Sequence, residues 1–196
     1  MPKVISVFGS SRPRDGEAQY QQAQKLGAAL AESGFEVCTG GYGGVMEAVS
    51  RGASEAGGKV LAVTAEFFRA KPNHWVSESF SVRTWEERLF ELIRRGDGYA
   101  VCAGGTGTLV ELAVVWEMLN KGVISGKPVV ALGDFWRPIV ERVREVETGH
   151  ASSWREAGSQ LISFAANASE AAHYLVTRLG VTEEAPKNLT GIMGTK

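Results

Sequence analysis

Short apolar runs alternate with glycine-containing loops and amphipathic stretches along most of the chain. Runs of Val, Ile, Leu and Ala without polar alternation are typical of strands that are covered on both faces of a sheet. The pattern predicts six strands, over Val4–Phe8, Phe35–Cys38, Lys59–Val63, Tyr99–Cys102, Pro128–Leu132 and Leu161–Phe164.

Apolar residues spaced three and four positions apart predict a helix after each strand. In the first helix the apolar face is formed by Ala23, Leu26, Gly27 and Leu30, and Gly34 is expected just beyond its carboxyl end. The other helices are expected over Met46–Glu55, Trp85–Ile93, Leu109–Leu119, Trp136–Glu147 and Ser169–Leu179.

Two segments do not follow this alternation. Thr64–Ser81 is long and has no clear period, which is typical of a lid, a binding loop or a mobile connection. The tail, residues 181–196, has little apolar content and is expected to fray.

Alternating strands and helices predict an α/β fold, a Rossmann-like, doubly wound and mainly parallel sheet with helices on both faces. The chain has 196 residues, which suits one domain. We therefore expect residues 1–180 to form a single nucleotide-binding domain and residues 181–196 to form a flexible C-terminal tail.

Composition narrows the partners and the compartment. A formal net charge of -1 provides no basic surface for nucleic acid. No apolar run approaches the roughly 18 residues of a membrane span, and the N-terminal segment reads as a strand, so a cytoplasmic protein is expected. Cys38 and Cys102 lack CxxC spacing and lie in apolar runs, which predicts buried free thiols.

Glycine is over-represented, with 24 residues and no collagen-like period. Eight of the 24 fall in three loops that follow predicted strands, Gly9–Ser11, Gly40–Gly44 and Gly104–Thr108. Ligands of open α/β sheets bind at the carboxyl ends of the strands, where the strand order reverses. If the predicted strands are ordered 3-2-1-4-5, all three loops line one cleft.

The loop Gly104–Thr108 has the composition of an anion site. Its glycines would let backbone N–H groups approach a phosphate, the next helix N-terminus would add a positive dipole, and two threonines would add hydroxyls. A tight turn with helix caps is the alternative. The candidate phosphate- or nucleotide-binding residues are Gly9, Ser10, Ser11, Gly41, Gly43, Gly44, Gly104, Gly105, Thr106, Gly107 and Thr108.

Known nucleotide fingerprints are missing from these loops. The first strand is followed by Gly-Ser-Ser rather than G-x-G-x-x-G, and no lysine follows Gly107 as a P-loop would require. The site is therefore expected to prefer a monophosphate or a similar compact anion over a dinucleotide. The three histidines show no metal-ligand spacing, so no metal is expected, and no G-x-S-x-G elbow indicates a serine hydrolase.

Two charged residues stand beside apolar ones. Glu111 lies inside the apolar Leu109–Leu119 helix near its N-terminus, and a buried carboxylate needs either a partner or a chemical task. A structural carboxylate paired across an interface is the alternative. Arg88 flanks the apolar stripe of its own helix, where a guanidinium is either solvated or able to reach a phosphate or carboxylate.

Two motifs resemble the LOG family, whose members were formerly labelled lysine decarboxylases. Residues 40–46, Gly-Gly-Tyr-Gly-Gly-Val-Met, resemble its GGGxxGLM stretch, and residues 103–111 resemble its PGGxGTxEE signature. The resemblance spans Val4 to Leu132, adds Met46 to the candidate nucleotide-binding residues, and looks closest to a divergent bacterial LOG-like branch. The chain is similar to molybdenum-cofactor carrier proteins as well.

The family's essential arginine lies 23 positions before its second signature glutamate, and Arg88 precedes Glu111 by the same 23. The chain departs from the family at Ala103, Val110 and Leu89, which replace a proline, a glutamate and a lysine. LOG proteins are cytokinin riboside 5'-monophosphate phosphoribohydrolases, which cleave a nucleoside monophosphate into base and ribose 5-phosphate. The resemblance also implies a homodimer with the cleft near the interface.

The leading hypothesis is N-glycosidic hydrolysis of a nucleoside 5'-monophosphate, either AMP or a cytokinin riboside monophosphate, with Glu111 and Arg88 as catalytic residues and no cofactor. The alternative is a non-catalytic carrier that holds a nucleotide or the molybdenum cofactor in the same cleft. A purely structural role would leave the three glycine loops without a use. A pyridoxal phosphate decarboxylase would need a lysine in these loops, and none is there.

Overall fold

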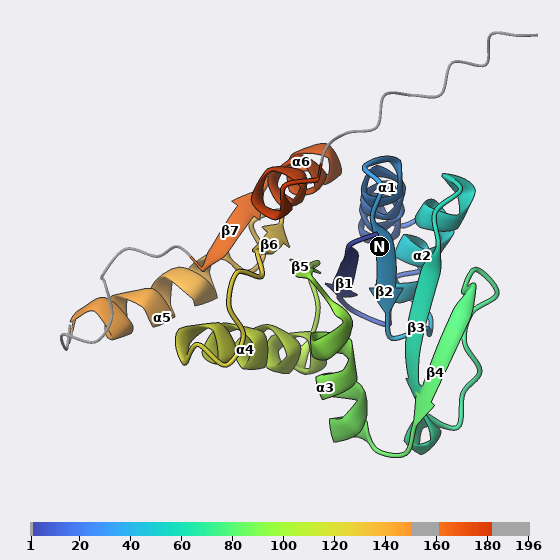
Figure 1. Cartoon of the computed structure of the whole chain (residues 1–196), viewed down its shortest axis with the longest axis horizontal. Helices are drawn as coiled ribbons and strands as arrows, with labels where there is room; N and C mark the ends of the chain where they lie inside the picture. The colour runs from blue at the N-terminus through green and yellow to red at the C-terminus, as the bar shows by residue number, and fades with distance from the viewer. Residues whose placement is uncertain (1, 150–160, 182–196) are drawn as a thin grey trace, which may run out of the picture.

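The computed structural model describes residues 2–149 and 161–181. This part of the chain folds around one sheet with the strand order β4-β3-β2-β1-β5-β6-β7 (Figure 1). Every neighbouring pair is parallel, so the predicted Rossmann-like α/β sheet is confirmed. The strands are β1 Val4–Phe8, β2 Glu36–Thr39, β3 Val60–Ala65, β4 Glu78–Val82, β5 Gly98–Val101, β6 Val129–Leu132 and β7 Ile162–Ala165.

Helices cover both faces of the sheet (Figure 1). The side chains of β1 alternate between two cores, Ile5 and Val7 with α1, α2 and α6, and Phe8 with α3, α4 and α5. The helices are α1 Ala18–Glu32, α2 Val45–Glu55, α3 Trp85–Arg95, α4 Thr106–Asn120, α5 Arg137–Gly149 and α6 Ala168–Leu179, with a short 3-10 helix η1 over Glu66–Phe68.

The strand order agrees with the 3-2-1-4-5 order considered for the first five expected strands, places the sixth beyond the fifth, and adds β4 beyond β3. The prediction of an irregular Thr64–Ser81 segment was therefore wrong at both ends, because β3 runs through Ala65 and β4 begins at Glu78. β4 is an edge strand with Phe80 half-buried and Ser79 and Ser81 exposed. Its alternating pattern differs from the continuous apolar runs of the inner strands.

The helix α4 is buried on one side only. Its sequence is apolar on nearly every side, yet only Thr108, Leu112, Val115 and Trp116 are buried. Leu109 is 37% exposed, so part of the apolar surface of α4 faces away from the core. Cys38 and Cys102 are free and buried, which confirms the prediction for both thiols. Burial raises the pKa of each to about 12. From residue 182 onward, the predicted tail lies outside the described residues.

The first turn of α3 is fixed by a capping box. The Thr84 side chain accepts a hydrogen bond from the Glu87 backbone N–H at 3.2 Å, and the Glu87 carboxylate accepts one from the Thr84 backbone N–H at 3.3 Å. In the middle of the sheet, the buried Ser6 hydroxyl donates to the Leu92 carbonyl at 2.7 Å. The helix is thereby held in register with β1.

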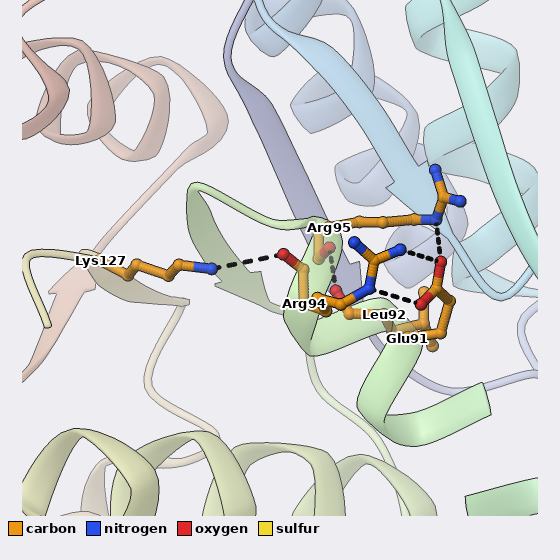
Figure 2. A network of polar contacts seen from close by, with 6 residues as sticks. Glu91, Leu92, Arg94, Arg95 and Lys127 are labelled. Atoms are coloured by element: carbon orange, nitrogen blue, oxygen red, sulfur yellow. Dashed lines mark hydrogen bonds and ion pairs between the residues drawn. The ribbon is translucent and has the colours of Figure 1, made fainter. Parts of the chain in front are cut away.

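The carboxyl end of α3 is held by a polar network (Figure 2). Glu91 accepts hydrogen bonds from Arg94 at 2.6 and 2.8 Å and from Arg95 at 2.7 Å. The Lys127 ammonium donates to the Gly96 carbonyl at 2.6 Å and lies 3.5 Å from the Arg94 carbonyl, where it complements the helix dipole. Both ends of α3 are therefore anchored. Among the described residues, no helix is long and apolar enough to cross a membrane.

The helices α1 and α2 cross at two glycines. A Cβ on Gly27 would meet the Val49 carbonyl, and a Cβ on Gly52 would meet the Gln24 carbonyl. The two backbones therefore pack without side chains between them. This contact sets the position of α2 and of the loop that precedes it.

We expect Gly27→Ala to lower the free energy of unfolding by about 1–3 kcal/mol, because the added methyl forces the two backbones apart. The better helix propensity of alanine, ~1 kcal/mol, offsets only part of that cost. Urea denaturation measures the effect. The control is Gly107→Ala, a helical glycine with nothing within 4 Å of its Cβ, which should be at least as stable as wild type.

Candidate functional site

The loops that follow β1, β2 and β5 meet at Ser10. Its backbone N–H donates to the Ala103 carbonyl at 3.3 Å, and its carbonyl accepts from the Val45 N–H at 2.8 Å. Gly44 lies against the backbone of Ser10 and Ser11 with a φ of 71°, so a side chain at this position would be both strained and blocked. The three glycine loops therefore converge at the point where the strand order reverses.

A cleft of about 1160 Å³ opens at this point. Of the candidate residues chosen from the sequence, the cleft brings together Gly9, Ser10, Ser11, Met46, Arg88, Gly104, Gly105, Thr106, Gly107, Thr108 and Glu111. These side chains and amides come from four separate segments of the chain, around residues 9–11, 46, 88 and 104–111. Whether they contact a ligand remains a prediction.

Three other candidates lie elsewhere. Gly41 has a φ of 79°, and its carbonyl accepts hydrogen bonds from the backbone and the side chain of Asn73 at 2.7 and 3.0 Å. Gly43 and Gly44 line a second hollow of about 760 Å³ behind the Ser11–Pro13 wall. These three glycines shape the loop rather than the surface of the main cleft.

One end of the cleft is built for an anion. The N–H groups of Thr106, Gly107 and Thr108 form the first turn of α4 and have no hydrogen-bond partner in the described part of the chain. Gly105 and Gly107 leave open space above them, while a Cβ on Gly104 would strike the Thr108 side chain. Free amides at a helix N-terminus form a ready site for phosphate.

Arg88 occupies the opposite wall, and its residue is only 7% exposed. Its Nε donates to the Val63 carbonyl at 2.9 Å, and its Nη2 lies 3.6 Å from the Met46 sulfur. Its Cζ lies 5.4 Å from the centre of the Tyr42 ring and 5.5 Å from that of Phe68. Burial lowers its pKa, but an arginine stays charged. No ion pair to this cation is found among the described residues.

The guanidinium of Arg88 explains why residue 40 is glycine. A Cβ built on Gly40 would coincide with Nη2 of Arg88 and would lie 2.6 Å from the Met46 sulfur. The second glycine loop therefore leaves room for an arginine that arrives from α3. The sequence places Gly40 in a glycine loop but does not reveal this neighbour.

Glu111 is half-buried on α4, just beyond its first turn. Burial raises the pKa of its carboxyl to about 7, and the positive charge of Arg88 opposes that rise. The carboxyl accepts no hydrogen bond from any described residue. A carboxyl that changes charge near neutral pH is suited to proton transfer.

Sequence reasoning missed the apolar wall of the cleft. Tyr42, Phe68, Ala70 and Phe135 come from connecting segments where hydrophobic periodicity is silent, whereas Trp85 and Leu89 mark the predicted helix but were not assigned to the cleft. For the connecting segments, the aromatic pair Phe67 and Phe68 was the available signal. The wall consists of Tyr42, Phe68, Ala70, Trp85, Leu89 and Phe135. Two exposed charged residues, Arg12 and Glu17, also line the cleft and were not predicted.

Comparison with known proteins identifies the family. A family model described as the SLOG cluster4 family matches residues 2–158. The chain belongs to the SLOG cluster4 family. The resemblance to LOG proteins that two motifs indicated is thereby confirmed at the level of the family.

Curated relatives of this SLOG cluster4 chain include LOG enzymes. It is 30% identical over 148 residues to the cytokinin riboside 5'-monophosphate phosphoribohydrolase of Rhodococcoides fascians, covering 72% of this chain and 74% of that protein. It is 31% identical over 136 residues to the protein of the same name from Mycobacterium tuberculosis, covering 68% and 71%.

Solved structures show the same fold. The molybdenum cofactor binding protein of Rippkaea orientalis superposes with a TM-score of 0.72 at 20% identity, covering 91% of this SLOG cluster4 chain and 98% of that one. The molybdenum cofactor carrier protein of Chlamydomonas reinhardtii superposes with a TM-score of 0.69 at 22% identity, covering 92% and 99%. At such identities the likeness concerns the fold.

We expect Glu111→Gln to stabilise the protein at pH 8 and to leave its stability nearly unchanged at pH 4. The folded pKa of about 7 exceeds the ordinary value of 4.5, so wild-type stability falls as pH rises from about 4.5 to 7. Glutamine cannot ionise and escapes this loss. Melting temperatures at both pH values measure the effect, with exposed Glu117→Gln as control. Equal shifts at pH 4 and pH 8 would contradict the raised pKa.

Proposed function

We propose that this protein hydrolyses the N-glycosidic bond of a nucleoside 5'-monophosphate, releasing the base and ribose 5-phosphate. The observation that carries the proposal is Glu111, a carboxyl whose pKa is raised to about 7, in one cleft with the unpaired cation Arg88 and the free amides of α4. The identity to LOG phosphoribohydrolases supports it.

The phosphate is held at the N-terminus of α4. Its negative charge is stabilised by the free N–H groups of Thr106, Gly107 and Thr108 and by the helix dipole. The Ser10 hydroxyl already accepts a hydrogen bond from the Arg12 N–H at 3.1 Å, which orients its own O–H as a donor. This end of the substrate fixes where the ribose lies.

The Glu111 carboxylate performs the chemical step. As the bond from C1′ to the base nitrogen breaks, its electron pair leaves with the base and positive charge develops on the ribose. The carboxylate stabilises that charge and accepts a proton from the water whose oxygen bonds to C1′. The protonated Glu111 passes that same proton to the departing base nitrogen, which restores the carboxylate, and the other proton of the water stays on the new C1′ hydroxyl.

Arg88 keeps part of the Glu111 population ionised at neutral pH. Its charge lowers the pKa that burial raises. Because no carboxylate pairs with it, the guanidinium also retains Nη1 donors for an anionic or polar group of the substrate. The role of Arg88 is therefore electrostatic, and it depends on the position of the cation.

We expect the wild-type protein to release free base from AMP or from isopentenyladenosine monophosphate, measured by chromatography. Activity should rise with pH through about 7 as Glu111 ionises. Both Glu111→Gln and Arg88→Lys should lower kcat, the former by at least ~100-fold because a positioned acid–base group contributes that much. Glu117→Gln, exposed on the same helix, is the matched control. Full activity of Glu111→Gln would show that the mechanism is wrong.

A second candidate function rests on the size of the cleft. Its volume of about 1160 Å³ is slightly larger than the ~300–1,000 Å³ typical of small-molecule sites. Such a cleft favours a larger phosphorylated ligand, as in a carrier of a nucleotide or of the molybdenum cofactor. A carrier would retain that ligand through purification, seen by native mass spectrometry, and would release no base.

We also propose that the protein is a homodimer. The helices α4 and α5 cover the same face of the sheet, and both leave apolar side chains in solvent, among them Leu109, Ile139 and Val143. The resemblance to LOG proteins implies the same assembly. Burial against a second copy would remove this surface from water.

We expect wild type to sediment as a dimer and Val143→Glu to sediment as a monomer, since a charge in an apolar interface is left without a partner. Sedimentation velocity measures both. Val123→Glu changes a valine that is exposed in the loop after α4 and should leave the dimer intact. A monomeric wild type would end the proposal.

A further inference from the structure

We propose that Phe68, together with Tyr42, is a positioning residue that holds the Arg88 guanidinium over the two aromatic rings and so fixes the place of this cation in the cleft it shares with Glu111. The proposal rests on the proposed function for its kinetic consequence. Its geometric part stands on the contacts of Arg88 alone.

The two rings stabilise the positive charge of Arg88, a role that a carboxylate usually fills. The Arg88 Cζ lies 5.4 Å from the Tyr42 ring centre and 5.5 Å from that of Phe68, both within cation–π range. The rings meet each other edge-on, with centroids 5.5 Å apart. A weakly hydrated planar guanidinium suits such a seat better than an ammonium would. Within residues 2–149 and 161–181, only the Val63 carbonyl accepts a hydrogen bond from an oxygen-directed N–H of this guanidinium, through Nε.

One of the two rings is firmly attached to the sheet. The Tyr42 hydroxyl donates to the Ala65 carbonyl at 3.2 Å and accepts from the Ala65 N–H at 3.0 Å. Phe68 lies three residues further on, at the end of η1, and is 41% exposed in the wall of the cleft. Of the two rings that contact the guanidinium, Phe68 is therefore the less firmly held.

The neighbouring Phe67 provides an internal control. It contacts the Phe68 ring edge-on at 5.3 Å, is 69% exposed, and makes no ring contact with Arg88. Its removal changes the same short helix and a similar apolar area. It leaves the contacts of Arg88 with Tyr42 and Phe68 in place.

Arg88 and Glu111 have few charged neighbours. Of the charged groups, Arg88 is the one that shifts the pKa of the Glu111 carboxyl. The pKa of Arg88 is shifted in turn by Glu111 on α4, by Tyr42 and by Cys38 on β2. Displacing the guanidinium therefore removes the principal opposing charge from Glu111, and the pKa of that carboxyl rises further. The other charged side chains in the wall of the cleft are Arg12 and Glu17.

The experiment compares Phe68→Leu, Phe68→Tyr and Phe67→Leu with wild type. Leucine keeps apolar volume but has no ring face, so Phe68→Leu should lower kcat about 10-fold with KM changed less than about 3-fold, within the strength of a partly desolvated cation–π contact. The acid limb of its pH profile should move upward by about half a pH unit or more. Phe68→Tyr and Phe67→Leu should both match wild type in this limb.

A second measurement does not depend on turnover. The Nε–H resonance of Arg88, assigned by its loss in Arg88→Lys, reports the hydrogen bond to the Val63 carbonyl. In Phe68→Leu it should broaden or exchange at least 10-fold faster, and in Phe67→Leu it should persist. An unchanged Arg88 resonance in Phe68→Leu would overturn the proposal. A wild type that cleaves no nucleotide would sink the proposed function while leaving this test to judge Phe68.

Discussion

A buried cation without an acidic partner is the constraint on which the site depends. Placing an unpaired charge in a protein interior costs several kcal/mol. Among the described residues, the charge of Arg88 is offset by one carbonyl, one sulfur, two aromatic rings and the electrostatic attraction of Glu111. Each of these groups must be in place at once. The glycine at position 40 and the two anchored ends of α3 follow from that requirement.

The cleft gathers groups that the rest of the fold would avoid. Free helix amides, a half-buried carboxyl without a hydrogen-bond donor and the unpaired guanidinium all line it. Elsewhere in the fold, charged side chains form ion pairs, as Glu91 does with Arg94 and Arg95. Polar and charged groups without partners that gather in one place are typical of a functional site. They also explain why such a site reduces stability.

Much of this architecture is legible in the sequence. Continuous apolar runs marked six of the seven strands, including the edge strand β7, and glycines after three of them located the reversal point. The edge strand β4 escaped because only one side of Phe80 and its neighbours is covered, so its apolar run is broken by serines. Hydrophobic pattern reports burial, and β4 has no buried residue, whereas the opposite edge strand β7 buries Ile162 and Ala165 and was predicted.

The candidate site was readable to a similar extent. The spacing of Arg88 and Glu111 pointed to two residues that do line one cleft, although the periodicity of α3 alone left Arg88 either solvated or inward. The contact of Arg88 with two aromatic rings could not be predicted, because Tyr42 and Phe68 are 26 positions apart in segments without hydrophobic periodicity. Contacts of that kind arise from the pairing of β2 with β3, which no local pattern encodes.

The outermost strand gives this fold a way to diverge. β4 is the edge strand next to β3. The connection between these two strands is therefore separate from β1, β5 and α4, which hold the phosphate end of the cleft. Phe68 and Ala70 belong to that connection and form part of the cleft wall. Insertions or replacements there would alter one side of the cleft without moving β1, β5 or α4. Descendants of a common ancestor can thus retain one anion cradle while acquiring different ligands through a single peripheral segment.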